Sequence, residues 1–272
     1  MLPSGKDQEV QTSNLTIDST EDKTPALEIK NYPIFGQDYE DVTIESQLLK
    51  GAIYYLISGH GGPDPGAVEK YNGTLIAEDE YAYDVTIRLA RMLISKGAMV
   101  YLIIKDKNDG IRNERVLVTD YDEVNHPKSR IPRSQKLRLR QRTETVNKLY
   151  KRHSGAYQRL ITIHVDSRSK GENIDVFLYH HENSKNGKRL SESIQRTFKE
   201  KYAKYQPNRT YSGTVKSRSD LYVIKYTLPP MTYIELGNIK NPKDQKRILN
   251  YENREAMAKW IAEGIMLDYE LK

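Results

Sequence analysis

The chain has no cysteine among its 272 residues, so it can form neither disulfides nor thiolate metal sites and has no cysteine nucleophile. A metal ion in this protein would therefore be held by histidine, aspartate and glutamate. The sequence also lacks any run of the ~20 apolar residues that a membrane-spanning helix needs. Its first 30 residues lack the hydrophobic core of a signal peptide. These absences predict a protein without a membrane span and without redox-active thiols.

Charge of one sign is not concentrated anywhere in the chain. The net charge is +6 and the isoelectric point is near 9.1, but the 43 basic residues are spread along the sequence rather than gathered in one block. A basic surface of this kind suits any anionic polymer as well as it suits nucleic acid. The composition therefore gives no specific sign of a nucleic-acid partner.

The N-terminal part of the chain is poor in large apolar side chains and rich in serine, threonine, aspartate and lysine. This composition is typical of a segment that does not fold by itself. We predict a flexible leader and lead-in over residues 1–50, with residues 31–50 able to pack on the domain. A single folded domain is predicted over residues 51–272. The leader is compatible with a cytosolic protein and with an exported protein whose signal peptide was removed.

Strand and helix patterns alternate through the folded part. Short apolar runs predict strands, and apolar residues three or four positions apart predict helices. The alternation is typical of an α/β fold, and we predict a mostly parallel or mixed central sheet of about six strands with helices on both faces. The predicted strands are residues 52–58, 98–104, 159–165, 174–179, 220–226 and 231–237, and the predicted helices are residues 78–96, 134–152, 190–202 and 253–270.

Three of these apolar strands end in an ionisable side chain. His60 follows the first strand in "SGHGGPDPGA", His164 lies near the end of "LITIHVDS", and Glu235 lies near the end of "MTYIELG". Function in such sheets gathers at the carboxyl ends of strands, and a buried charge or imidazole is costly without a partner or a metal. Each residue alone is equally compatible with a capped turn or a buried hydrogen bond. Three at matching strand ends indicate a site.

Four motifs occur in order along the chain: "HGGPDPGA", an acidic residue that opens the next helix, "ITIHVDS" and "IELGNIKNPKD". With these motifs, about residues 52–267 resemble the zinc-dependent N-acetylmuramoyl-L-alanine amidases of bacterial cell-wall metabolism, the amidase-3 type. The resemblance implies one zinc ion per chain, held by His60, Glu78 and His164, and a catalytic glutamate, Glu235. It also implies hydrolysis of the amide between the lactyl carbonyl of muramic acid and L-alanine in peptidoglycan.

The chemistry of such a site agrees with the residue types present. Catalytic zinc commonly has three protein ligands of the histidine and carboxylate kind, and it lowers the pKa of bound water to about 7. A nearby carboxylate can accept the proton of that water and return it to the leaving amine. Within "AEDEYAYD", the family's helix pattern favours Glu78 as the third ligand, and Glu80 is the alternative. The two point about 200° apart around a helix, so they do not easily bind one ion together.

Two other classes of function stay open from the sequence. One is a non-catalytic module on the same fold that binds cell-wall or other anionic polymer, and the other is a zinc peptidase or deacylase with a different substrate. Under the resemblance, the partner is peptidoglycan, no nucleic acid is involved, and a monomer is expected. The protein would act in the cell envelope or periplasm, or after secretion.

Residues 107–133 are additional to the usual family pattern. We predict either a solvated surface loop with a small hairpin or a rim over the substrate groove, in which Arg112, Arg115 and Lys128 meet the acidic stem peptide. Asp64 is expected either to bond within its own turn or to contact a zinc ligand. The other histidines are predicted at the surface: His126, His153, His180 and His181.

Overall fold

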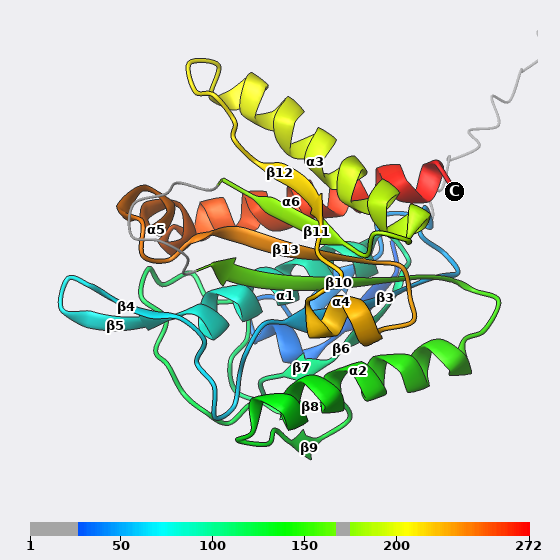
Figure 1. Cartoon of the computed structure of the whole chain (residues 1–272), viewed down its shortest axis with the longest axis horizontal. Coiled ribbons are helices and arrows are strands. Elements are labelled where there is room, and N and C mark those ends of the chain that lie inside the picture. The colour runs from blue at the N-terminus through cyan, green and yellow to red at the C-terminus, as the bar shows by residue number, and fades with distance from the viewer. Residues whose placement is uncertain (1–26, 167–174) are drawn as a thin grey trace, which may run out of the picture.

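A computed structural model describes residues 27–166 and 175–272, so the first 26 residues of the predicted leader lie outside the described part. A six-stranded sheet in the order β12-β11-β13-β10-β3-β6 forms the centre of the molecule (Figure 1). Its strands are β3 (Ala52–Ser58), β6 (Met99–Leu102), β10 (Tyr157–Asp166), β11 (Phe177–His180), β12 (Thr214–Ser217) and β13 (Met231–Asn238).

The sheet is mixed. Strands β6, β3, β10 and β13 run parallel to one another, whereas β11 and β12 run antiparallel to β13. All seven residues of β3 are buried, as expected of a strand with helices on both faces. Because β3, β10 and β13 are parallel neighbours, their carboxyl ends lie at one edge of the sheet. The predicted α/β class, with one mixed sheet of about six strands, is confirmed.

Helices cover both faces of the sheet. Tyr54 and Ile163 belong to the side-chain cluster that packs under α1, α3, α5 and α6, whereas Tyr55 and Ile57 pack with α2 and α4. Figure 1 shows α3 and α6 on the side of the strands opposite to α2. The helices are α1 (Glu78–Ser95), α2 (Gln135–Arg152), α3 (Lys185–Tyr205), α4 (Tyr222–Tyr226), α5 (Pro242–Leu249) and α6 (Tyr251–Glu270).

Residues 27–50 pack on the domain. They form β1 (Ile29–Asn31), the 3₁₀ helix η1 (Pro33–Phe35) and β2 (Asp41–Thr43), and β1 pairs with β2. Phe35 and Leu49 are buried in the main apolar cluster beside α1. The part of the lead-in that the sequence analysis allowed to pack therefore contributes to the core. The division of the chain at residue 50 stays a prediction.

Two local predictions are wrong or incomplete. Residues 220–226 were predicted as a strand, but they contain the short helix α4, whose Val223 and Ile224 pack against α2 and β13. A short apolar run looks the same in a strand and in a buried helix, so periodicity does not separate them. The hairpin of β4 (Val68–Tyr71) and β5 (Thr74–Ala77), which projects from the domain before α1, was not predicted (Figure 1). Its turn is the Asn-Gly pair that such hairpins favour.

The additional segment, residues 107–133, is partly core. Ile111 and Leu117 belong to the main apolar cluster, and the carbonyls of Arg112 and Glu114 accept hydrogen bonds from Arg254 of α6. The expected small hairpin is present, because β8 (Val124–Asn125) pairs with β9 (Ser129–Arg130) and with β7 (Ile104–Lys105). The expectation of a solvated loop is wrong for Ile111 and Leu117 in the first half of the segment, which are buried, whereas Val118 is 78% exposed.

Candidate metal centre and active site

His60 lies in a tight turn directly after β3. Its φ is +61°, and Gly61 and Gly62 follow with φ of +94° and +63°. Such values are common for glycine and rare for other residues, so two glycines after His60 let the chain leave the strand abruptly. The Gly61 N–H donates to the Asp64 carbonyl at 2.8 Å, which closes the turn. The imidazole is thereby held at the carboxyl edge of the sheet, with 26% of the side chain exposed.

Glu78 is the first residue of α1, and its carboxylate is buried. The backbone N–H of Ala67 donates to Oε2 at 3.0 Å, and the N–H of Val165 donates to Oε1 at 3.0 Å. These two bonds hold the carboxylate between the loop after β3 and the end of β10. Oε1 lies 2.9 Å from His164 Nδ1, and Oε2 lies 3.3 Å from His60 Nε2.

His164 lies near the end of β10 and is mostly buried. Its ring stacks on the Tyr233 ring of the neighbouring strand, with centroids 4.4 Å apart and an interplanar angle of 14°. It also meets the His60 ring edge to face at 5.0 Å. Directly after β3, a Cβ at Gly59 would lie 2.4 Å from ring atoms of His164, so only glycine leaves room for this ring.

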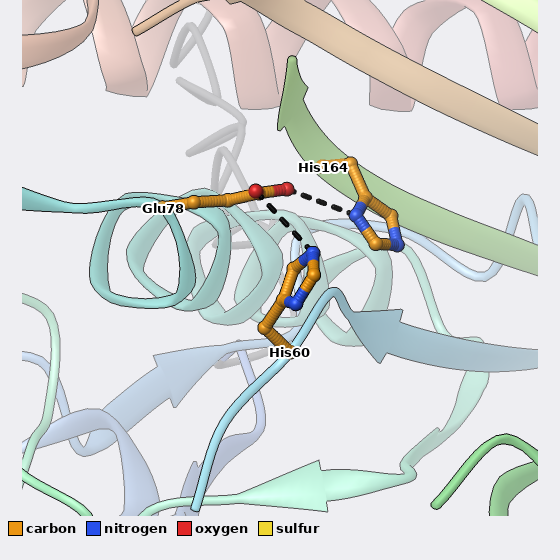
Figure 2. A group of neighbouring side chains, drawn as sticks. All are labelled: His60, Glu78 and His164. Carbon is orange, nitrogen blue, oxygen red and sulfur yellow. Dashed lines mark hydrogen bonds and ion pairs between the residues drawn. The ribbon is translucent and has the colours of Figure 1, made fainter. Parts of the chain in front are cut away.

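The structure therefore brings together three of the predicted site residues. His60, Glu78 and His164 each offer a ligand atom, and these atoms lie within 4.8 Å of one another. Figure 2 shows the Glu78 carboxylate between the two imidazoles, one from the turn after β3 and one from β10. Two imidazoles and one carboxylate are a donor set that suits catalytic zinc. The residues present thus fit the metal that the sequence analysis expected.

Glu80, the alternative to Glu78, faces away from both histidines. Its carboxylate accepts hydrogen bonds from Arg112 Nη2 at 2.9 Å and from the Asp120 N–H at 3.0 Å. Arg112 is also paired with Asp109. The expected role of Arg112 as a contact for an acidic substrate therefore does not fit, because its charge is used inside the protein.

Glu235 lies on β13 beside His164. The two residues are register partners on neighbouring parallel strands, so their side chains emerge on the same face of the sheet. Glu235 is 7% exposed. All four residues expected to carry the chemistry therefore gather at the same edge of the sheet.

Protonation in the metal-free site follows from burial and from the Glu78 carboxylate. Burial opposes a charge on His60, but hydrogen bonds with Asp64 and Glu78 outweigh it and raise the pKa of His60 to about 10. Burial lowers the pKa of His164, and the hydrogen bond with Glu78 only partly offsets this. Burial would raise the pKa of Glu78, yet the two histidines lower it well below its usual range. The site therefore holds an anionic carboxylate beside a cationic imidazole, a position for which a metal cation would compete with the proton.

Asp64 fulfils both roles left open by the sequence. It accepts from the Gly66 N–H in its own turn at 3.3 Å, and its Oδ2 lies 2.9 Å from His60 Nδ1. Arg138 Nη2 donates to the same oxygen at 2.6 Å. Burial would raise the pKa of Asp64, but the hydrogen bond with His60 and the charge of Arg138 outweigh it and lower the pKa to about 2. The ionised Asp64 carboxylate can only accept hydrogen bonds, so His60 carries a proton on Nδ1 and donates it in a hydrogen bond to Asp64. The other ring nitrogen, Nε2, faces Glu78.

Two basic residues of α2 hold this loop, and neither was predicted to belong to the site. Arg138 anchors Asp64, and Arg142 donates to the His60 carbonyl. Both arginines are nearly buried and lie one turn apart on α2. Their i, i+4 spacing on an otherwise basic helix was the available signal, but nothing in the sequence alone shows which loop they face.

The prediction of surface positions for the other histidines is wrong in part. His180 is 6% exposed, and its Nδ1 contacts the His181 carbonyl at 2.9 Å. His126 and His153 are half-buried against Tyr101. His181 is half-buried as well. The sequence around these histidines is polar, and it does not show that residues distant in the chain bury them.

A cavity of about 530 Å³ opens beside the His60 turn. The turn contributes Gly62 and Pro63, and residues 107–133 contribute all the other lining residues. This places part of residues 107–133 next to the candidate site. The other lining residues are Tyr121, Glu123, Arg130, Ile131 and Arg133.

Comparison with known proteins identifies the class. Residues 55–266 match the family described as N-acetylmuramoyl-L-alanine amidase, and the chain belongs to this family. The protein is accordingly a hydrolase of the peptidoglycan amidase type. Among the described residues, none of the helices is long and apolar enough to cross a membrane.

One relative in sequence and two solved structures of similar fold illustrate the likeness. The chain is 26% identical over 222 residues to the germination-specific N-acetylmuramoyl-L-alanine amidase of Bacillus subtilis (strain 168). The aligned region covers 80% of each protein. The fold of this chain is similar to that of the CwlD amidase of Clostridioides difficile, which was solved in complex with the GerS lipoprotein. The TM-score is 0.60 at 23% identity, and the match covers 81% of this chain and 99% of that one. The amidase Ami1 of Mycobacterium smegmatis gives a TM-score of 0.58 at 17% identity, covering 82% and 99% of the two chains.

Proposed function

We propose that this protein is a zinc-dependent amidase that cleaves the bond between N-acetylmuramic acid and L-alanine in peptidoglycan. One zinc ion would be held by His60, Glu78 and His164, and Glu235 would be the general base and acid. The observation that carries the proposal is the convergence of these three donor groups within 4.8 Å, with Glu235 on the adjacent strand in register with His164.

The protein's own residues prepare the ligands. Asp64 fixes the tautomer of His60, so that Nε2 is the nitrogen left for a ligand role. Backbone N–H groups of Ala67 and Val165 orient the Glu78 carboxylate. The stacked ring of Tyr233 and the absent side chain of Gly59 set the plane of the His164 ring. Such orienting contacts commonly change metal affinity by about 10- to 100-fold when removed.

Zinc, when bound, lowers the pKa of a water molecule to about 7 and polarises a carbonyl group. Glu235 accepts a proton from the attacking water while the oxygen of that water forms a bond to the lactyl carbonyl carbon. The same carboxyl then delivers the proton to the alanine nitrogen as the C–N bond breaks, which releases a carboxylic acid and a free amine.

The remaining parts of the proposal concern substrate and place. The cavity beside the His60 turn would receive part of the substrate, and its Arg130 and Arg133 would favour negatively charged groups. Peptidoglycan lies outside the cytoplasmic membrane, so the enzyme would act in the cell envelope or after secretion. All four proposed site residues come from one chain, so a monomer would suffice.

Metal analysis and product analysis test the proposal together. Purified protein should contain about one zinc per chain, and mass spectrometry of digested peptidoglycan should show free L-alanine amino termini. His60→Ala and Glu78→Gln should lose zinc and activity together, whereas Glu80→Gln is the matched control that should keep its zinc. Full activity in metal-free protein would refute the mechanism. Zinc binding without wall digestion would favour a binding module, and cleavage elsewhere would favour another zinc hydrolase.

A further inference from the structure

A second group of acidic side chains lies on the other side of the His60 turn. Asp79 and Glu80 follow Glu78 in the first turn of α1, and Glu123 comes from the additional segment, just before β8. Each offers one carboxylate oxygen, and these oxygens lie within 4.8 Å of one another. All three side chains are buried, with exposed fractions of 1%, 1% and 5%. We call this group the Asp79–Glu80–Glu123 cluster.

The hydrogen bonds of the cluster leave one oxygen unsatisfied. Glu80 accepts from Arg112 and from the Asp120 N–H, and Glu123 Oε2 accepts from the Gly62 N–H at 2.6 Å. Asp79 Oδ1 accepts from the Glu80 N–H at 3.0 Å. Asp79 Oδ2 is buried and has no hydrogen-bond partner among the described residues. A buried polar oxygen without a partner is costly and calls for a physical explanation.

Ion pairs to the cluster are also few. Among the described residues, the one ion pair to its three carboxyl groups is that between Arg112 and Glu80. The same guanidinium is shared with Asp109. Asp79 and Glu123 have no such counter-charge among the described ion pairs, although both are buried. A cation between the three carboxylates would balance the charge and give Asp79 Oδ2 a partner at once.

The ligand atoms indicate which cation fits. All are carboxylate oxygens, without the nitrogen or sulfur that zinc favours, and such a set is typical of hard divalent cations. Ca²⁺–oxygen distances of about 2.3–2.6 Å place two ligands of one ion at most about 5 Å apart, so three oxygens within 4.8 Å of one another are close enough to bind one ion. Glu123 also lines the 530 Å³ cavity, which provides access to the cluster.

We propose that the Asp79–Glu80–Glu123 cluster binds a second divalent cation, with Ca²⁺ as the best fit, separate from the His60–Glu78–His164 centre. Because Glu123 also bonds to Gly62, the ion would fasten the additional segment to the start of α1 and to the His60 turn. Its role would be to hold the wall of the cavity in place. The proposal does not depend on the proposed zinc chemistry.

Calcium titration of the full chain, first loaded with one equivalent of zinc, tests the proposal by isothermal calorimetry. One further binding event is expected for Ca²⁺, with an increase in melting temperature. Asp79→Asn and Glu123→Gln, each nearly isosteric, should each weaken Ca²⁺ binding by about tenfold or more, since affinity depends on ligand charge. Glu114→Gln removes an exposed carboxylate of the same segment and should leave binding unchanged.

His60→Ala distinguishes the two centres, because it should lose zinc and keep Ca²⁺ binding. Circular dichroism checks that each variant is folded, and having two cluster variants guards against the failure of one. The proposal is overturned if the zinc-loaded protein binds no Ca²⁺, Mg²⁺ or Mn²⁺, in which case protons satisfy the cluster. It is overturned as well if both cluster variants bind Ca²⁺ normally or if His60→Ala abolishes that binding.

Discussion

His60 has a φ of +61°, a backbone conformation that residues other than glycine rarely adopt. A residue in this region carries strain of about 1–3 kcal/mol, which the surrounding structure must offset. Here the Asp64 contact and the Arg142 bond to the His60 carbonyl supply that support. The turn and the proposed ligand role are therefore not alternatives, because the strained turn is what directs the imidazole toward Glu78.

Glu235→Gln tests the proposed acid–base role at the level of one atom. Glutamine keeps the size and shape of the side chain but cannot take up a proton. Turnover on peptidoglycan should fall by roughly 10²- to 10⁴-fold, while zinc content stays near that of the wild type. Loss of zinc in this variant would make Glu235 a ligand and would exclude the role proposed for it.

Gly59→Ala tests how the His164 ring is positioned. The new Cβ would lie 2.4 Å from ring atoms of His164, so the ring must move away from Glu78. Zinc affinity, measured by competition with a chelator, should fall by about 10- to 100-fold. Gly73→Ala is the control, since its Cβ meets nothing within 4 Å and the substitution adds only backbone strain at φ of +83°. Equal zinc affinity in the two variants would contradict this account.

Asp106 gives a pH-dependent prediction. Burial raises its pKa to about 6, and bonds from the N–H groups of Asn108 and Asp109 only partly offset this. Between pH 4 and about 6 Asp106 keeps a proton in the folded protein that it has lost in the unfolded chain, so its contribution to the free energy of unfolding decreases as pH rises and levels off above this window. Asp106→Asn keeps the acceptor oxygen and should remove a decrease on the order of 1–3 kcal/mol. Chemical unfolding of the wild type and of the Asp106→Asn variant from pH 4 to 7 measures this difference. If the free energy of unfolding changed with pH by the same slope in both proteins, the prediction would be contradicted.

At the scale of elements, the first turn of α1 serves two centres. Glu78 faces the two histidines, whereas Asp79 and Glu80 face the additional segment. Acidic residues at a helix N-terminus are also favoured by the helix dipole, so this position lowers the cost of gathering three carboxylates. One helix end thus connects the candidate active site to residues 107–133.

Arg254 of α6 joins that segment to two helices. Its side chain is fully buried, with Nε 2.6 Å from Asp84 of α1 and Nη2 bonded to the carbonyls of Arg112 and Glu114. Arg254→Met would leave the carbonyls of Ile248 and Leu249 without the bonds from Arg254, while Asp84 keeps its pairing with Arg88. Leaving a buried group unsatisfied typically costs about 1–3 kcal/mol. Urea unfolding should show a loss of this order.

The matched control for Arg254 is Arg140→Met, which removes an exposed arginine paired with Glu144 on α2. Surface pairs of this kind contribute little, so its unfolding midpoint should hardly change. Equal effects of the two substitutions would mean that residues 107–133 are not held by Arg254.

At the scale of the whole molecule, the order of strands decides which residues meet. Residues 52–58, 157–166 and 231–238 are far apart in sequence, yet β3, β10 and β13 are neighbours in the sheet. Since all three are parallel, His60, His164 and Glu235 reach one edge. The general rule for parallel sheets predicted this edge, and the register between β10 and β13 then sets His164 directly beside Glu235.

The sequence by itself determined the α/β class, the apolar strands and the glycine-rich turn at His60, because these follow from local periodicity and from the backbone freedom of glycine. Tertiary structure alone decided which acid of the first α1 turn faces the histidines, that residues 222–226 are helical, and that His180 is buried. It also decided that Asp79 meets Glu123. Each of these depends on contacts between residues distant in the chain, and a local pattern carries no information about which distant side chain will supply the partner.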